Sequence, residues 1–353
     1  MMDRRLLSRR MSELAVRAID GMGELWIVLV LLALVGLFTI AAPAGTFLSY
    51  DNFRDIALNT SELLVIAAGS TFILIAAGLD LSVGSVVVFC SVIAAESLGF
   101  ASGDPHQGYP NAFLGTMVAI PITLLAGIGW GVLNGLAITK LKVPAFIVTL
   151  GTLGMALGFA QIISGGLNVA SVPPQLQSAF IGGGLLGLIP WPVVLAAIVV
   201  GVLGTTLSRT RFGLHTYALG SNREALRRAG VNVDRHTVAL YALAGLLAGI
   251  VGFMDVARFS SASLAAHTQD NLNAIAAVVI GGTSLFGGRG RMSGTVIGAF
   301  IPAVLRNGFI LLAIQPFWQN VVVGAVLILA VYLDQLRRGG FAAWRQRLAE
   351  RGG

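Results

Sequence analysis

Long stretches without a charged side chain constrain this chain more than any other feature of its sequence. Only 11% of its residues are charged, against roughly 25% in a soluble globular domain. Several stretches exceed the roughly 20 residues that a membrane-spanning helix needs. We therefore expect an all-α fold, a polytopic bundle of transmembrane helices. The uncharged apolar stretches are residues 25–50, 63–79, 81–95, 112–139, 145–208, 237–254, 274–288 and 307–333.

About ten membrane spans are expected. The stretch 145–208 is too long for one span, and its Gly-, Pro- and Ser-rich middle, residues 164–184, predicts a loop between two spans. The first stretch is longer than the roughly 7–15 apolar residues of a signal peptide, so it is expected to stay as the first span. The expected spans are 25–42, 61–78, 83–99, 112–138, 145–164, 189–208, 237–257, 272–283, 292–312 and 317–334.

The basic residues predict the orientation of the chain. With the N-terminus in the cytoplasm, 20 of the 23 lysines and arginines fall in cytoplasmic segments, as the positive-inside rule requires. Both termini are then cytoplasmic. Because the basic residues flank apolar stretches, the net charge of +7 indicates the lipid bilayer as partner and no nucleic acid. The expected organisation is a cytoplasmic segment at 1–24, one transmembrane domain at 25–335 with a cytoplasmic loop at 209–236, and a basic cytoplasmic tail at 336–353.

Cys90 is the single cysteine, so no internal disulfide and no Cys/His zinc pattern is available. In its apolar run it is expected to pack as a small hydrophobe. We expect no metal site and no catalytic centre, and the chain is not expected to be an enzyme.

The longest polar stretch between spans, "GSNREALRRAGVNVDRH" at 220–236, predicts a short helix outside the bilayer. Ser221 and Glu224 match an S-x-x-E capping box, and Gly230 is placed to end the helix in the left-handed conformation. Two interpretations stay open. The helix is either a solvated loop element that satisfies the positive-inside rule, or a docking helix for a cytoplasmic partner.

The stretch "VVIGGTSLFGGRGRMSG" at 278–294 holds a GGxxxxGG pattern. A phosphate-binding P-loop needs a lysine and a hydroxyl residue after its last glycine, and both are missing here. The pattern therefore predicts a tight cytoplasmic turn and no nucleotide site. The glycines expected to be structural there are Gly281, Gly282, Gly287 and Gly288.

The stretch "GLDLSVGS" at 78–85 places a carboxylate, Asp80, inside one of the most apolar parts of the chain. One interpretation is a helix break, in which Asp80 or Ser82 caps the next helix and Gly78 and Gly84 permit the turn. The others are a polar substrate path and a proton or ion site.

A proton relay would need further ionisable partners in the spans. The sequence offers Glu62, Glu96 and Arg306, each near a span end or alone. This distribution argues against an ion-coupled secondary carrier that works by itself.

Few other polar side chains lie in the spans. Trp130 and Asn134 are one helical turn apart and share a face. An aromatic ring beside an amide would suit a sugar, but a packed tryptophan and a hydrogen-bonded asparagine fit equally well. Asn273, at the start of the eighth expected span, completes the candidate substrate path with Asp80 and Ser82.

Four segments resemble the ribose/galactose/xylose-type permeases of bacterial ABC sugar importers. They are "GLDLSVGS", "VPAFIVTLGTLG" at 143–154, "GSNREALRRAGVNV" at 220–233 and "AVVIGGTSLFGGRGRMSGTVIGA" at 277–299, in the order that this family has. The resemblance covers about residues 55–335. The chain departs from the family at 220–228, where the family often has a second glycine and an alanine pair.

The resemblance implies a permease subunit of the bacterial inner membrane, acting as a dimer, usually a homodimer. A periplasmic binding protein would deliver a sugar (a pentose, a hexose or a cyclic polyol). A separate cytoplasmic ATPase would bind ATP and Mg, so this chain needs no cofactor. A permease of the same superfamily for branched-chain amino acids or nucleosides is the main alternative. The segment that matches the family's ATPase-coupling loop contains Ser221, Asn222, Arg223, Glu224, Ala225, Arg227, Arg228 and Gly230.

Overall fold

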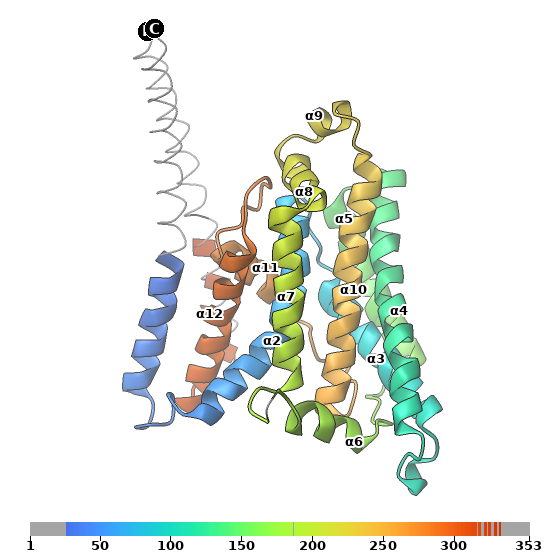
Figure 1. Ribbon diagram of the computed structural model, residues 1–353, viewed down its shortest axis with the longest axis vertical. Helices are drawn as coiled ribbons and strands as arrows, with labels where there is room; N and C mark the ends of the chain where they lie inside the picture. The colour runs from blue at the N-terminus through green and yellow to red at the C-terminus, as the bar shows by residue number, and fades with distance from the viewer. Residues whose placement is uncertain are drawn as a thin grey trace.

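The computed structural model describes residues 26–185 and 187–315, and beyond these only 317–318, 321–322, 324–325, 328–329 and 332. Within these ranges the chain is almost entirely helical, and the only β structure there is two isolated bridges. The expected all-α fold is confirmed for this part of the chain (Figure 1).

Seven helices of the described part are long and apolar enough to cross a membrane. Six of them coincide with expected spans to within four residues at each end. The second expected span, at 61–78, was wrong in its bounds, because α2 begins eleven residues earlier and ends three residues earlier. The chain is therefore a multi-pass membrane protein. The seven are α2 (Tyr50–Ile75), α3 (Val83–Ser102), α4 (Ala112–Lys140), α5 (Ala145–Ile163), α7 (Trp191–Arg209), α10 (Val233–Phe259) and α12 (Met292–Leu311).

Two further apolar helices are shorter, Trp26–Ala41 and α11 (Asp270–Ile280). The eighth expected span, at 272–283, is found as the helix α11, but this helix is too short to confirm a crossing of the bilayer. At about 1.5 Å per residue, α11 reaches only about half of the roughly 30 Å hydrocarbon layer. It ends there because Gly281 and Gly282 follow, and Gly282 takes a left-handed φ of +86°.

Three expectations fall on residues outside the described ranges. These are most of the tenth span at 317–334, the segment 1–24 and the tail 336–353. The total of about ten spans and the cytoplasmic termini therefore stay predictions.

Helices α4 and α10 pack backbone to backbone, side by side in Figure 1. A Cβ added at Gly127 would lie 2.2 Å from the Gly245 carbonyl oxygen, and one at Gly131 would lie 2.2 Å from the Tyr241 carbonyl oxygen. Only glycine permits this approach, which small residues provide between membrane helices. The sequence predicts this packing, because residues 127–135 and 244–252 repeat glycine and alanine at four-residue spacings, and the structure confirms it.

The two ends of the bundle carry different short elements (Figure 1). One end carries α8 (Arg211–Ser221) and α9 (Arg223–Arg228), and we call it the α9 end. The opposite end carries α6 (Pro174–Gln177) and a π-helical turn at Ser178–Gly182, and we call it the α6 end. A 3₁₀ turn at Pro105–Gln107 precedes α4. The expected loop at 164–184 is confirmed, because α6 and the π-turn lie within it.

Candidate functional site

The link between α2 and α3, residues 76–82, is non-helical chain inside the bundle. Its left-handed residue is Ala77, with φ of +58°, and not Gly78. A Cβ on Gly78 would lie 3.0 Å from the Tyr241 hydroxyl, and a Cβ on Gly84 only 2.4 Å from the His267 carbonyl oxygen. The prediction that Gly78 and Gly84 permit the turn by their backbone freedom was therefore wrong. They permit close packing around the break.

Asp80 braces the end of this link. Its Oδ1 accepts hydrogen bonds from the Ser82 backbone N–H at 2.8 Å and from the Ser82 hydroxyl at 2.6 Å. Ser82 occupies the N-cap position of α3, but its side chain accepts no amide of that helix. Side-chain capping by Asp80 or Ser82 is therefore not observed. The carboxylate forms an Asx-type turn that fixes the residue before the helix.

A chain of buried polar side chains continues from Ser82 into two helices. The Asn134 amide on α4 donates to the Ser82 hydroxyl at 3.0 Å, and the Thr152 hydroxyl on α5 donates to Asn134 Oδ1 at 2.7 Å. All four side chains, from Asp80 to Thr152, are buried. A buried polar network whose members are all bonded holds its elements in one arrangement. The break is thereby tied to α4 and α5.

Two more helices hold the backbone of the link. The Tyr241 hydroxyl on α10 donates to the Leu79 carbonyl at 3.1 Å, and the Asn271 amide on α11 donates to the Leu81 carbonyl at 3.1 Å. Irregular backbone inside a membrane domain needs such partners, because lipid offers none. Sequence reasoning missed Tyr241 and Thr152, since nothing local marks a side chain whose partner lies on another helix, 162 positions away for Tyr241 and 18 for Thr152.

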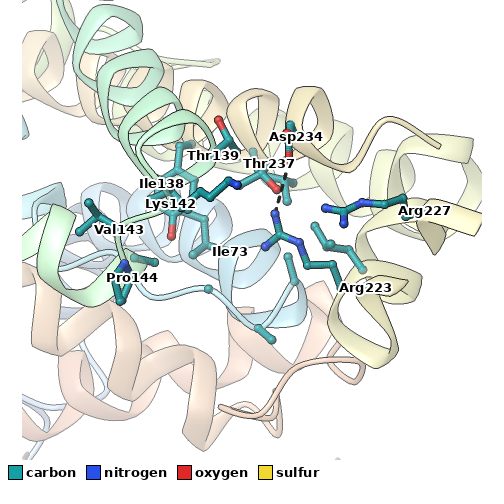
Figure 2. A pocket seen from close by; sticks show the side chains of 17 residues that line it. Ile73, Ile138, Thr139, Lys142, Val143, Pro144, Arg223, Arg227, Asp234 and Thr237 are labelled. Carbon is teal, nitrogen blue, oxygen red and sulfur yellow. Dashed lines mark ion pairs between the residues drawn. The ribbon is translucent and has the colours of Figure 1, made fainter. Parts of the chain in front are cut away.

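A cavity of about 560 Å³ lies at the α9 end, and we call it the α9-end cavity (Figure 2). It extends from α9 to Gly78 and Tyr241, so its floor is the broken link. Arg223 pairs there with Asp234 at 3.5 Å. Figure 2 shows Lys142 and Arg223 reaching toward the same space from opposite walls. The mouth of this cavity is thus basic, and its floor is apolar.

A second cavity, of about 380 Å³, lies near the α6 end, and we call it the α6-end cavity. Its wall holds an ion pair between Arg258 and Glu62 at 3.1 Å. His267 lies between two carboxylates, with Nδ1 2.6 Å from Asp270 Oδ2 and Nε2 3.1 Å from Asp255 Oδ1.

The expectation that Glu62 lacks further ionisable partners for a relay was therefore wrong. Arg258 reaches it from another helix 196 positions away. The available signal was the pair Asp255 and Arg258, one helical turn apart at the end of a span and followed by His267 and Asp270.

The five residues expected on a substrate path do not form one group. Asp80, Ser82 and Asn134 are joined in the buried chain. Asn273 lines the α6-end cavity. Trp130 packs between Phe89 and Phe159, with ring centroids 5.6 and 6.1 Å away, which fits the packed-tryptophan interpretation.

The polar segment at the α9 end holds the expected short helix as α9, between the end of α8 and the start of α10. The chain breaks at Asn222, whose Oδ1 accepts from the Ala225 amide at 2.9 Å and so caps α9. Ser221 is the last residue of α8, and its hydroxyl donates to the Tyr217 carbonyl at 2.8 Å. The predicted capping box of Ser221 and Glu224 was therefore wrong, because Ser221 is itself helical.

The predicted end of this helix is confirmed. Gly230 has φ of +84°, its amide donates to the Arg227 carbonyl, and the Val231 amide donates to the Leu226 carbonyl. This pair of bonds is a Schellman motif. Leu226 is the one buried side chain of α9, while Glu224 and Arg228 are exposed and paired at 3.3 Å. Helix α9 is thus attached to the bundle by one buried apolar side chain, and its charged side chains face outward.

The glycine-rich turn joins this end of the bundle to the break. The Gly288 amide donates to the Ile75 carbonyl at 2.8 Å, and the Tyr217 hydroxyl on α8 donates to the Gly290 carbonyl at 2.7 Å. Gly287 and Gly288 both have positive φ, as a tight turn requires. Gly281 packs against the backbone of α12 at Gly294. The predicted tight turn is confirmed.

Comparison with known proteins assigns the chain to a family. Residues 52–331 match the family described as the permease component of the branched-chain amino acid transport system. The ribose import permease of Escherichia coli K12 is 35% identical over 311 residues, covering 87% of this chain and 92% of the relative. The galactose/methyl galactoside import permease of Haemophilus influenzae is 34% identical over 333 residues, covering 91% and 96%. The D-allose transport system permease of E. coli K12 is 32% identical over 317 residues, covering 90% and 92%.

No solved structure matches the chain. The four motifs that resemble sugar importer permeases all lie within the matched region. On this coverage and identity, the chain belongs to the permease-component family that includes these ribose, galactose and allose permeases.

Proposed function

We propose that this chain is the membrane-spanning permease subunit of an ABC importer that carries a sugar into the bacterial cytoplasm. The observation that carries the proposal is the 35% identity to a ribose import permease over 92% of its length. The family description names branched-chain amino acids, but the relatives compared above are named for ribose, galactose and allose. Their names favour a monosaccharide over an amino acid.

The partners follow from the two ends of the bundle. The charged, exposed surface of α9 fits a docking helix for a cytoplasmic ATPase, which would bind ATP and Mg itself. The basic-residue bias supports a cytoplasmic α9 end and hence a periplasmic α6 end, where a sugar-binding protein would dock. A second copy of the chain would complete the permease in the inner membrane.

Coupling would run through short contacts between backbones. A Cβ on Gly220, near the end of α8, would overlap the Ile75 carbonyl at the end of α2, so the two backbones touch. The glycine-rich turn contacts the same carbonyl through Gly288. A displacement of α8 and α9 by the ATPase would therefore reach the broken link directly.

The broken link is suited to act as the barrier. Its Gly78 end forms the floor of the α9-end cavity, and just beyond its other end Gly84 on α3 packs on the loop that lines the α6-end cavity. Movement of the link relative to α4, α5, α10 and α11 would open one cavity while the other stays closed. This is alternating access around a broken membrane helix.

Uptake of radiolabelled sugars into proteoliposomes tests the proposal. The vesicles contain this chain and its ATPase, ATP inside, and the binding protein outside, with ribose, galactose, allose and xylose as the panel. We expect uptake of at least one sugar that stops when any one component is left out. Leucine replaces the sugar as a test of the amino acid alternative. Uptake by this chain alone, driven by a proton or sodium gradient, would contradict the proposal and favour a secondary carrier.

A further inference from the structure

The α6-end cavity gathers ionisable side chains that are nearly buried within the helix bundle. The side chains of Glu62 and Arg258 are 10% and 14% exposed, and those of Asp255 and His267 are 5% and 6% exposed. Such groups are costly in a membrane domain and usually mark a path or a ligand site. Packing alone would favour apolar side chains of the same size. The cavity therefore needs a functional explanation.

The charges around the cavity balance. Its wall carries three carboxylates and three basic groups, His267 included. Burial lowers the pKa of His267, but hydrogen bonds and charge from Asp255 and Asp270 outweigh it and raise the pKa to about 10. The imidazole is then protonated at neutral pH. The six groups are Glu62, Asp255, Asp270, Arg258, His267 and Arg306.

A balanced wall disfavours an ionic ligand. A carboxylate oxygen of Glu62, one of Asp255 and a ring nitrogen of His267 lie within 4.8 Å of one another, which is close enough to hold a metal ion. However, Glu62 is already paired with Arg258, and a protonated His267 has no lone pair to offer. An anion would meet the three carboxylates. Neither sign of charge is therefore favoured.

A neutral ligand with many hydroxyl groups fits this wall. Carboxylates accept hydrogen bonds, guanidinium and imidazolium groups donate them, and amides do both, while each sugar hydroxyl donates and accepts. The wall has bonding capacity to offer. Asn273 holds Asp270 only by a long hydrogen bond of 3.4 Å, so its amide is available to a ligand. The volume of about 380 Å³ lies within the range of small-molecule sites.

The cavity also lies next to the barrier. Its loop packs against Gly84 through the His267 carbonyl, and Asn271, two residues before Asn273, holds the Leu81 carbonyl. A ligand in the cavity would thus rest against the far side of the broken link from the α9-end cavity.

We propose that the α6-end cavity binds one monosaccharide through its hydroxyl groups, as a transient site between the binding protein and the broken link. The proposal rests on the proposed function. It adds a sugar site within the permease itself, with Asn273 and His267 among its hydrogen-bonding groups.

Protection of an introduced cysteine tests the site directly. The chain has one cysteine, Cys90, and it is buried, so its background reaction with a small methanethiosulfonate is low. Thr268→Cys places a reporter on the cavity wall without removing a charged group. Gln175→Cys, on exposed α6 outside the cavity, is the matched control. The complex of chain and ATPase is held in nanodiscs without the binding protein, so docking cannot mask the reporter.

We expect the transported sugar to slow labelling of the Thr268→Cys variant by about tenfold at ten times its dissociation constant. The Gln175→Cys variant should not respond. Asn273→Leu, added to the reporter, should raise the half-protecting concentration by about three- to tenfold, the value of one net hydrogen bond.

The failures are distinguishable. If no panel sugar enters wild-type proteoliposomes, the proposed function is wrong. If a sugar is taken up but leaves labelling of the Thr268→Cys variant unchanged, or if sodium or calcium ions protect it and sugar does not, the sugar site is wrong and the function stands. Gln269→Cys, also on the wall, replaces the reporter should Thr268→Cys fail to assemble.

Discussion

Two buried carboxylate clusters in this molecule are satisfied in different ways. Around Asp80, every partner is an uncharged group: an amide, a hydroxyl and, beyond them, Asn134 and Thr152. Around Glu62 and Asp255, the partners are the charged groups Arg258 and His267. The first cluster fills its space and fixes a backbone. The second surrounds an open cavity. In this bundle, neutral hydrogen bonds brace a broken helix, and paired charges line a space for a ligand.

Removing a charge from the second cluster should have the largest effect on stability. Arg258→Met leaves Glu62 buried without its cation, which costs about 3–5 kcal/mol. The thermal unfolding midpoint of the purified permease in detergent measures the loss. Because the cost comes from the unpaired charge, the double variant Glu62→Gln with Arg258→Met should recover most of it. A double variant as unstable as the single one would show that the pair is not the cause.

Alkaline pH should act on the same cluster through His267. Its folded-state pKa of about 10 lies above the roughly 6.5 of an unfolded histidine. The stabilisation is therefore fully present below about pH 6.5 and is lost as the pH rises through about 10, on the order of 5 kcal/mol in all. The unfolding midpoint of the wild type minus that of His267→Gln, followed from pH 6 to 10.5, reports it. A pH-independent difference would mean that the imidazole is not charged.

Breaking the neutral cluster should cost less. Asn134→Leu leaves the Thr152 hydroxyl without its acceptor across the helices and removes a donor to Ser82, a loss of about 1–3 kcal/mol. Since the link is no longer tied to α4, sugar uptake should fall further than ATPase activity. Thr116→Val is the matched control, because Thr116 bonds only within its own helix. Normal uptake by Asn134→Leu would separate this cluster from transport.

The smallest effect on stability is expected at the exposed charges of α9. Glu224→Ala removes surface ion pairs, which should change stability by less than about 0.5 kcal/mol. If α9 docks the ATPase, the same change should lower ATP-driven uptake by about tenfold or more. Asp51→Ala, another exposed acid at the first turn of a helix, is the control. Unchanged uptake would leave α9 as a solvated loop helix.

The sequence predicted what depends on local composition. Uncharged runs located the seven long helices, and Gly230 marked the end of α9. The sequence did not predict the N-cap of α9, because two neighbouring residues could each fill that position. Ser221 and Asn222 are both good caps, and only the length of α8 assigns the cap to Asn222.

The partners of Asp80 were beyond prediction for a different reason. Asn134 is 52 positions from Ser82 and Thr152 is 18 positions from Asn134, and these side chains meet only because α3, α4 and α5 pack together. The same holds for Glu62 and Arg258, 196 positions apart. A single sequence gives no distance between such residues, so the sites they form emerge only from the packed bundle.

The contact between Gly220 and the Ile75 carbonyl has a mechanical consequence. Side chains between two helices act as soft springs, because they change rotamer before the backbones move. At this contact there is no side chain to yield, since two main chains meet directly. A displacement of α8 would therefore be transmitted directly to the end of α2. Replacing Gly220 by alanine would place a Cβ against the Ile75 carbonyl, so the two main chains would have to move apart at this contact.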